Sequence, residues 1–530
     1  MPAIITDQYR ILNAETFVDS FVGIGTTGNN NYYTFLGHPD PTNINVPKYG
    51  DMNWDTRIPD PKDNFDQENL YYDSMLFLKK VTENDVRRVI KRVDWQSGTT
   101  YDMYRNNYEI DNKTPQTKFS TLYESNYYVV NSEYKVYLCL DNGANIDFPL
   151  GQKSQYEPNF VDTTRQQAGN GSDGYWWKYL FTIAPSDIVK FATNKYIPLP
   201  KKWGDTTTAT IKNAAVDGKV ESVVLKKIGS GYAIKDSGTT DSNGTISNIP
   251  IVGDGSGGQV QVKLNSGSIE SVEMVAGGSG YTYGVVRFED KVAGGDNKQV
   301  SGGSGGEFEI IIPPKGGHGA DIYRELGGYK VMIYSKYDNN VADAPDYVVG
   351  NDFSRVGLVK NPLVYGGTQL LNSTTATNLG ALKLVPSPGT ARTDDVTFVK
   401  NAQITQTVGV GSTAVGYVAS WNPDTGILRY YQPVGFSTLS QYSYKKLDFV
   451  GVAATVNGGT GGNLWPDITF DNVSSIKVGG KDVDLGQTFV DGKAPPDVKK
   501  YSGDIIYIDN RSSVTRSSSQ KEEVKIVVEF

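Results

Sequence analysis

The feature that most constrains the fold is an internal repeat. GKVESVVLKKIGSGY at Gly218–Tyr232 returns as GSIESVEMVAGGSGY at Gly267–Tyr281, and GSGGQVQVKL from Gly255 returns as GSGGEFEIII from Gly303. Each copy predicts strands separated by glycine-rich turns, because glycine readily adopts the positive φ angles of tight turns. Two copies of about 50 residues favour a paired β module over a solenoid, which needs three or more repeats. We therefore predict an inserted, Gly-rich β domain over residues 206–318.

A second change of composition predicts a second insertion. Residues 366–492 are rich in Thr, Val, Gly and Asn and contain the strand-like segments TAVGYVASW and GILRYYQPV. The NPDTG sequence between these segments is a turn signal, so they should form a hairpin. We predict an inserted β domain here as well, which leaves residues 1–205, 319–365 and 493–530 as the core.

The core also has the sequence pattern of an all-β protein. Short runs of β-branched and aromatic residues, such as SNYYVVNSEYKVYLCLD, YKVMIYSK and EVKIVVEF, alternate with Gly, Asn, Asp and Pro. Helices are expected in a few short places, of which the best are Asn13–Phe21 and the stretch around Thr82–Arg88, where Thr82 and Asp85 have the spacing of a capping box. The prediction is an all-β fold with a few short helices.

Charge and cysteine content exclude further classes of protein. Lys plus Arg number 51 and Asp plus Glu number 59, a net charge of −8, which is the wrong sign for neutralising nucleic-acid phosphates. Cys139 is the only cysteine, so one chain cannot form an internal disulfide or a thiolate metal cluster. Its segment, YKVYLCLD, predicts a buried strand. We expect no nucleic-acid partner.

The sequence offers no membrane-targeting signal. The N-terminal MPAIITDQYRILNAETF lacks the basic start and the apolar stretch of a signal peptide. No segment approaches the ~18 consecutive apolar residues of a transmembrane helix. We expect a soluble protein that is made in the cytoplasm and has no membrane partner.

Motifs for catalysis or cofactor binding are weak. Gly253, Gly255 and Gly258 satisfy G-x-G-x-x-G, but QVQVKL follows with strand alternation, whereas a dinucleotide site needs a helix there. His38 and His318 are the only histidines, which is too few for a persuasive metal site or triad, and loop positions are expected for both. The regularly placed aspartates of calcium-binding glycine repeats are missing. We predict no enzyme activity, no catalytic residues, no metal and no cofactor.

Aromatic clusters are the one feature that favours binding. Tyr and Trp combine apolar area with a polar group, so they suit protein interfaces and carbohydrate platforms alike. Strand alternation should place about half of each cluster in the core and leave the other half accessible. The clustered residues are Tyr127, Tyr128, Tyr175, Trp176, Trp177 and Tyr179.

Eight segments outside the predicted insertions carry a resemblance to a known family. They are YYTFLGHPDP (Tyr32–Pro41), VIKRVDWQSGTTYD (Val89–Asp102), NYYVVNSEYKVYLCLDN (Asn126–Asn142), GSDGYWWKYLFTI (Gly171–Ile183), TNKYIPLP (Thr193–Pro200), DFSRVGLVKNPL (Asp352–Leu363), YSGDIIYIDNR (Tyr501–Arg511) and QKEEVKIVVEF (Gln520–Phe530). In this order they resemble the baseplate wedge subunit of T4-like contractile-tailed bacteriophages, the family of the eighth gene product. The resemblance covers residues 1–200, 320–363 and 495–530, about half of the chain.

The resemblance implies a structural role in the virion. It implies a layered antiparallel β-sandwich with short helices in loops, made in the host bacterial cytoplasm and assembled into the tail baseplate. Its expected partners are other wedge proteins, with a second copy of itself and peripheral tail-fibre proteins as further candidates. The family supplies no catalytic residues, and the contact residues are not predicted.

The insertions set this chain apart from the T4 form of that family. Insertions of this type resemble those of cyanobacterial myophages, and nothing about residues 206–318 or 366–492 follows from the family. A glycan-binding or polysaccharide-degrading phage tail protein remains the alternative, because aromatic and carboxylate side chains could line a sugar groove.

Overall fold

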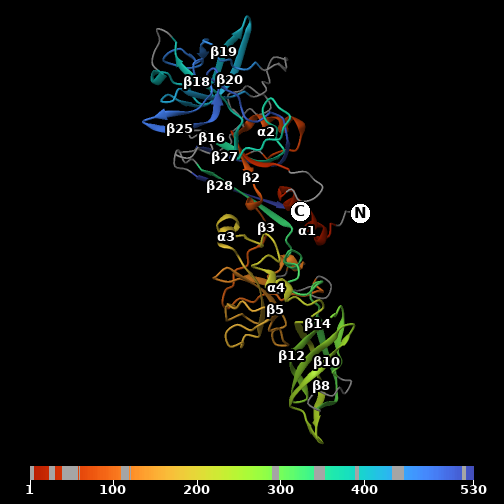
Figure 1. The fold of residues 1–530 in the computed structure, drawn as a ribbon. Helices are drawn as coiled ribbons and strands as arrows, with labels where there is room; N and C mark the ends of the chain where they lie inside the picture. Colours follow the sequence, from red (N-terminus) through yellow and green to blue (C-terminus); the bar gives the residue numbers. More distant parts are fainter. Residues whose placement is uncertain are drawn as a thin grey trace. The chain divides into compact units, whose positions relative to one another are not determined.

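The computed structural model describes residues 5–22, 30–38, 58, 60–108, 119, 121–288, 298–338, 352–387, 393–432, 447–515 and 521–530. Strands predominate, so the predicted all-β class is confirmed (Figure 1). The chain divides into two compact units. The first consists of Met1–Thr16, Arg87–Met332 and Val527–Phe530, and the second of Phe17–Val86 and Ile333–Ile526.

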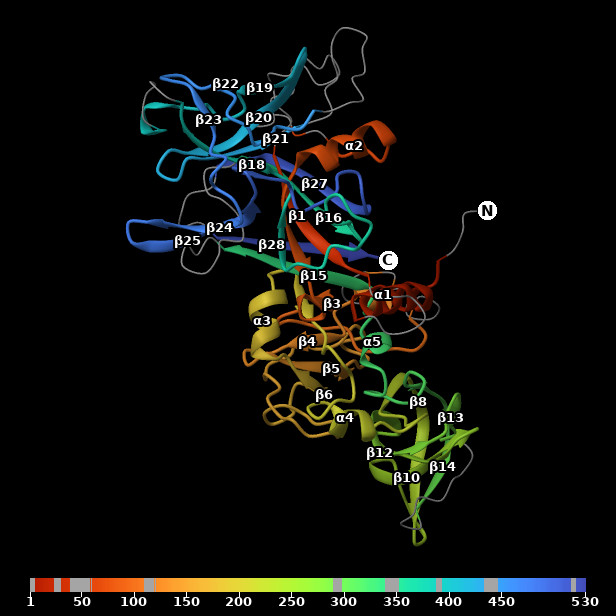
Figure 2. The same cartoon turned by 45° about the horizontal axis from the view of Figure 1, so that its top comes forward.

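The first unit contains a three-stranded antiparallel sheet of β4 (Tyr128–Val130), β5 (Lys135–Asn142) and β6 (Tyr175–Thr182), in that order (Figure 2). Its core is aromatic and aliphatic, and Cys139 lies fully buried in β5 as predicted. Other elements that lie wholly or partly in this unit are α1 (Asp7–Val22), β3 (Val86–Lys91), α3 (Pro185–Phe191), β7 (Tyr196–Pro198), α4 (Ala209–Asn213) and α5 (Ile322–Glu325). Strands β3 and β7 pair with each other. The division between the units falls within α1, β3, β15 (Lys330–Asp338) and β28 (Lys521–Glu529).

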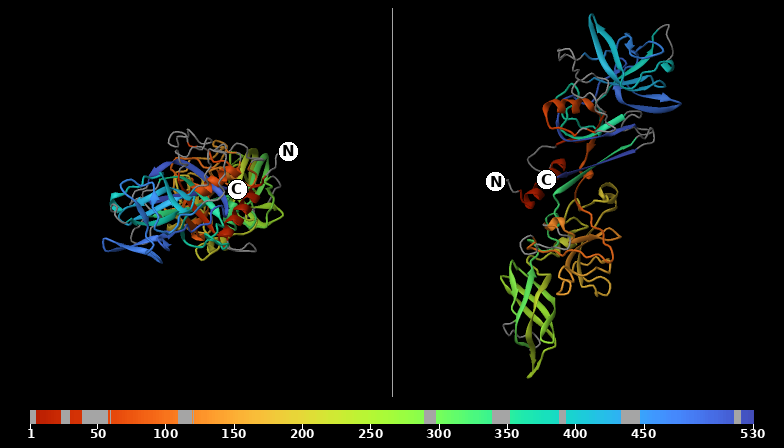
Figure 3. Two further views of the ribbon diagram at one scale, coloured as in Figure 1. Left: turned by 90° about the horizontal axis from the view of Figure 1, so that it is seen from above. Right: turned by 180° about the vertical axis from the view of Figure 1, so that it is seen from behind.

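The repeated segment forms two antiparallel sheets, which we call the repeat module (Figure 1 and the right panel of Figure 3). One sheet has the order β12-β11-β10-β13 and the other β14-β8-β9. An apolar core of its own lies between them, with Ile246, Val260 and Val262 fully buried. The strands are β8 (Ser222–Asp236), β9 (Thr239–Asp241), β10 (Gly244–Gly253), β11 (Ser256–Asn265), β12 (Ser268–Ser279), β13 (Gly284–Val286) and β14 (Gln299–Ile311). The predicted limits of this domain, 206 and 318, stay a prediction.

The two copies exchange strands in a symmetric way. The first strand of copy one, β8, pairs with β14 of copy two, while the first strand of copy two, β12, pairs with β11 of copy one. The registers correspond, since Ser230 opposite Ser304 is matched by Ser279 opposite Ser256. Each copy therefore completes the sheet of the other.

The repeated Tyr and Gly residues pack against each other, which accounts for their recurrence in both copies. The hydroxyl of Tyr232 accepts a hydrogen bond from the Gly306 amide at 2.8 Å, and that of Tyr281 accepts one from the Gly258 amide at 3.1 Å. Both rings are almost fully buried. A Cβ atom added at Gly255 would lie 2.5 Å from Cγ of Tyr281. The GSGG strand thus has no side chain at the places where the tyrosine of the other copy lies.

The second unit contains a five-stranded antiparallel sheet and a closed β-barrel. The five-stranded sheet has the order β17-β2-β1-β16-β27, with β1 (Tyr32–Gly37), β2 (Met75–Val81), β16 (Asp352–Lys360), β17 (Thr375–Thr377) and β27 (Asp504–Thr515). The barrel runs β21-β20-β19-β22-β23-β18, and the pairing of β18 with β21 closes it (Figure 2). Its strands are β18 (Gly380–Pro386), β19 (Gln403–Gly409), β20 (Ser412–Asn422), β21 (Ile427–Tyr431), β22 (Val456–Asn457) and β23 (Leu464–Pro466).

Apolar side chains, among them Leu384, Ile404 and Leu428, fill the barrel as side chains must in a small barrel. Its strands lie within the predicted insertion 366–492, and the bounds of that insertion stay a prediction. The predicted hairpin is confirmed, because β20 and β21 pair across the NPDTG turn. Next to the barrel are β24 (Val473–Val478), β25 (Lys481–Phe489) and β26 (Lys493–Ala494).

The helix predictions are partly wrong. Helix α1 contains the predicted Asn13–Phe21 segment but starts at Asp7. The capping box of Thr82 and Asp85 forms, yet it starts only a 3-10 turn, Glu83–Asp85, after which β3 begins at Val86. The β-branched run that follows outweighs the capping signal, because a cap satisfies only the first amide groups of a helix. Helices α2 (Phe65–Ser74) and α3 were not predicted.

Candidate functional site

The most distinctive polar feature of the first unit is a buried charged junction where the repeat module meets the β4-β5-β6 sheet. Nζ of Lys178 on β6 lies 3.0 Å from Oε2 of Glu221, with side-chain exposures of 5% and 3%. Lys219 approaches the same carboxylate at 3.2 Å. Burial alone would raise the pKa of Glu221, but Lys178, His318 and Lys219 outweigh it, so this pKa lies below its usual value. Glu221 directly precedes β8, so the ion pair fixes the point at which the chain enters the module.

A second ion pair, which is mostly buried, holds the last strand of the module. The Arg105 guanidinium lies 2.8 Å from Oε2 of Glu309 on β14, and Lys226 on β8 lies 3.1 Å from the same oxygen. Asn107 also donates a hydrogen bond to Glu309. Burial opposes ionisation of Glu309, but Arg105 and these hydrogen bonds lower its pKa. Ion pairs therefore join both strands to the part of the unit that contains the β4-β5-β6 sheet, through Glu221 just before β8 and Glu309 on β14.

Arg165 and apolar packing complete the junction. Arg165 donates to the backbone carbonyls of Glu221 at 2.9 Å and Met274 at 3.2 Å, and its guanidinium lies 4.0 Å from the ring centre of Trp176. Val224 and Ile311 of the module belong to the same apolar core as the β4-β5-β6 sheet. Since ion pairs, backbone hydrogen bonds and apolar contacts all cross the junction, the geometry indicates a rigid connection.

His318 lies where the chain leaves the module. Its Nδ1 is 2.7 Å from Oε1 of Glu325, both side chains are almost fully buried, and Oε2 of Glu325 accepts the Gly319 amide at 2.7 Å. The ring of Tyr104 meets the His318 ring edge to face. The expectation of a loop position is correct, but the sequence did not indicate that His318 is buried and paired. The contacts of this pair join the loop after β14 to α5, which is a structural role.

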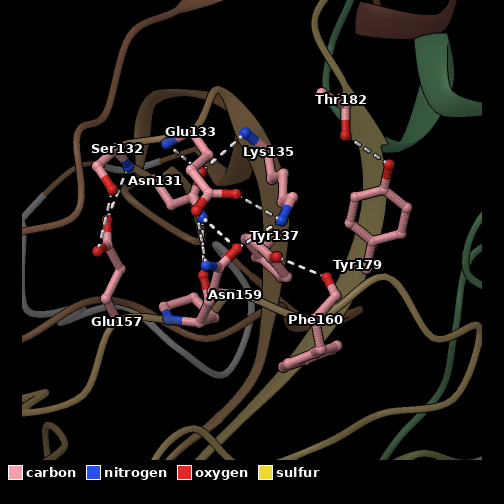
Figure 4. Close-up of polar contacts among 11 residues, drawn as sticks. Asn131, Ser132, Glu133, Lys135, Tyr137, Glu157, Asn159, Phe160, Tyr179 and Thr182 are labelled. Carbon is pink, nitrogen blue, oxygen red and sulfur yellow. Dashed lines mark hydrogen bonds and ion pairs between the residues drawn. The ribbon is translucent and has the colours of Figure 1, made fainter.

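A second polar cluster surrounds the β4–β5 turn (Figure 4). Oδ1 of Asn131 accepts the amides of Glu133 and Lys135 at 3.0 and 2.8 Å. Lys135 lies 2.7 Å from the Glu133 carboxylate, and Asn159 donates to that carboxylate at 2.9 Å. Glu157 accepts the amide of Ser132 at 2.7 Å. These carboxylates hold the turn in place, and hydrogen bonds from Lys135 and Asn159 lower the pKa of Glu133.

The aromatic clusters are more buried than the sequence predicts. Tyr127, Tyr128, Tyr175 and Trp177 are at most 1% exposed. The other two, Trp176 and Tyr179, are partly buried. The face of β6 that carries Trp176 and Lys178 packs against Arg165 and Glu221 rather than facing solvent. These six residues therefore form no exposed platform for a sugar.

The remaining predicted motifs fall in structural positions. Gly253 ends β10, and β11 follows from Ser256, so a strand stands where a dinucleotide fold needs a helix. His38 is buried in the second unit, with its ring 4.2 Å from the ring centre of Tyr431. Among the described residues, no group of three or more His, Cys, Asp or Glu side chains could hold a metal ion. No helix in the described part of the chain is long and apolar enough to cross a membrane.

Asp141 at the end of β5 makes the stability of this region depend on pH. Burial raises its pKa to about 6, although the Gly143 amide, Arg165 and Arg105 act in the opposite direction. The folded state thus keeps a proton that the unfolded chain releases near pH ~4, so stability falls as the pH rises from about 4 to 6. We expect Asp141→Asn to raise the melting temperature at about pH 7 and to leave it almost unchanged below about pH 4.

Thermal unfolding of the variant at both pH values is the measurement. The exposed Asp162 provides the control, since Asp162→Asn should shift neither value. An equal effect of Asp141→Asn at both pH values would show that ionisation of Asp141 does not matter.

Comparison with known proteins adds no family to this description. The chain matches no model of a protein family and no curated protein.

Proposed function

We propose that the chain is a structural subunit of the baseplate wedge of a contractile-tailed bacteriophage, and that it connects sibling wedge subunits in the virion. The observation that carries the proposal is where the eight resembling segments lie. They contain β1, β4, β5, β6, β7, β16 and β28, most of β27 and half of β3, which are framework strands of the two units. An ordered resemblance over core strands supports a shared fold better than one over surface loops would.

The charged junction supports the same function. A contracting baseplate needs rigid bodies whose interfaces rearrange, rather than subunits that deform. Lys178 and Glu221 are buried and paired, and Arg105 and Glu309 are paired and mostly buried, so the repeat module does not hang on a loose linker. Breaking such a pair costs several kcal/mol because it leaves a buried charge uncompensated.

No observation favours the glycan-active alternative. Its platform would need accessible aromatic side chains, and the clustered aromatics are buried or partly buried. The carboxylates of Glu221, Glu309 and Glu325 are engaged by Lys, Arg or His partners at 2.7–3.0 Å. We therefore propose no catalytic role for them.

Cryo-electron microscopy of the source virion tests the proposal. We expect density for this chain in the tail baseplate, in contact with other wedge proteins, and cross-links from purified virions to those proteins. Density in the capsid, in the sheath or at a fibre tip would contradict the proposal, as would a particle that lacks the chain.

A further inference from the structure

The loop that follows β5 exposes three apolar side chains within five residues. Ile146 is 51% exposed, Phe148 54% and Leu150 45%. Asp147 and Pro149 between them are also exposed. Single exposed apolar residues are ordinary on protein surfaces, whereas a contiguous group at one place marks an interaction site. We call residues 145–151 the IDFPL loop.

Hydrogen bonds hold the IDFPL loop in one conformation. The Asn145 amide donates to the Phe148 carbonyl at 3.1 Å, and the Phe148 amide donates back to Oδ1 of Asn145 at 2.9 Å. The Gly151 amide donates to the Phe148 carbonyl at 3.0 Å, with Gly151 at a φ of +105°. The side-chain amide of Asn142 donates to the Leu150 carbonyl at 3.2 Å. A partner would therefore meet a preformed loop and lose little conformational entropy on binding.

The charge of the loop limits the kind of partner. Asp147 is its only charged residue, and no Lys or Arg occurs from Asn142 to Gln152. An anionic lipid surface attracts basic segments, so it is a poor partner. Contact between two copies of the loop would bring two Asp147 carboxylates together, and like charges at an interface cost several kcal/mol. An apolar groove with a basic side chain at its rim matches the loop in both respects.

We propose that the IDFPL loop docks into an apolar, basic-rimmed groove on a sibling wedge protein, with Phe148 as its central anchor. This inference rests on the proposed function, because that function supplies the partner. Aromatic side chains at the centre of an interface carry a large share of the binding free energy, and the neighbouring apolar residues exclude water around them. Asp147 acts on specificity and association rate through its charge.

The test is a binding titration between the purified full chain and purified wedge proteins of the same virion. We expect Phe148→Ser to weaken binding to one of them by about 30-fold or more, as at an interface hot spot. Phe148→Leu should keep most of the wild-type affinity, because leucine still provides an apolar anchor. Asp147→Lys should slow association and reverse its dependence on salt.

Val189 on α3 provides the matched control, because it is 70% exposed and outside the loop. Val189→Ser should leave every affinity unchanged, and circular dichroism should show that all variants are folded. If the wild-type chain binds a wedge protein and Phe148→Ser binds equally well, the docking role of the loop is wrong. A wild-type chain that binds none of the wedge proteins contradicts the proposed function, and the docking role falls with it.

Discussion

Alanine at Gly303 should destabilise the repeat module by about 3 kcal/mol. Gly303 has a φ of +79°, and a Cβ atom there would overlap the ring of Tyr232. The left-handed backbone costs roughly 1–2 kcal/mol for a residue with a side chain, and forcing atoms into a packed core costs about 1–3 kcal/mol more. Thermal unfolding and amide hydrogen exchange in β8 and β14 measure the effect, since these strands contain the affected contact.

Gly305 separates the two causes. It lies two residues further along β14 at a φ of +86°, but the nearest atom to an added Cβ is 3.7 Å away, on Gly229. Gly305→Ala should therefore show the backbone cost alone, about 1–2 kcal/mol. Equal losses for Gly303→Ala and Gly305→Ala would mean that the Tyr232 ring moves aside freely, and that the packing explanation of the repeat is wrong.

Lys178→Met, where the chain enters the module, should lower the free energy of unfolding by a comparable or larger amount. The substitution leaves the Glu221 carboxylate 3% exposed, with the more exposed Lys219 as its remaining ion-pair partner among the described residues. Removing one partner of a buried ion pair typically costs about 3–5 kcal/mol. We expect a loss of this size in the free energy of unfolding, together with faster amide exchange in β8.

Two further variants test the reason for that loss. Lys178→Met combined with Glu221→Gln should recover much of the stability, because no uncompensated charge then remains buried. Lys227 on β8 and Glu307 on β14 form an exposed pair, with exposures of 64% and 55%. Lys227→Met should cost less than about 1 kcal/mol. If Lys227→Met destabilises the protein as much as Lys178→Met does, burial does not determine how much these ion pairs contribute to stability.

The strands were predictable from local sequence. Alternation around Cys139 and the NPDTG turn depend on neighbouring residues only, and β5 and the β20–β21 hairpin form as expected. Local signals can also mislead. The capping box of Thr82 and Asp85 is present, but the run from Val86 onward favours a strand. The start of α2 at Phe65 falls in a segment, DPKDNFDQE, whose many charges resemble those of a solvated turn.

The junction and the strand exchange could not be predicted in the same way. Lys178 and Glu221 are 43 residues apart, and neither differs locally from a surface residue. The two copies of the repeat are so similar that pairing within each copy and pairing between copies fit the sequence equally well. Strand alternation predicts that about half of the aromatic residues of β6 are accessible. The sequence does not show that the repeat module covers the outer face of that strand.

The strand exchange also sets an order of events on the ribosome. Strands β11 and β12 are joined by a tight turn and can pair as soon as both have emerged, with Asn265 opposite Ser268. Most of β8 has to wait, because Ser222 pairs with Ile311, near the end of the module. Proteins are synthesised from the N-terminus, and long-range strand pairs form slowly. A nascent chain that stops before β14 would carry a long unpaired strand edge, so the module is completed only by its last strand.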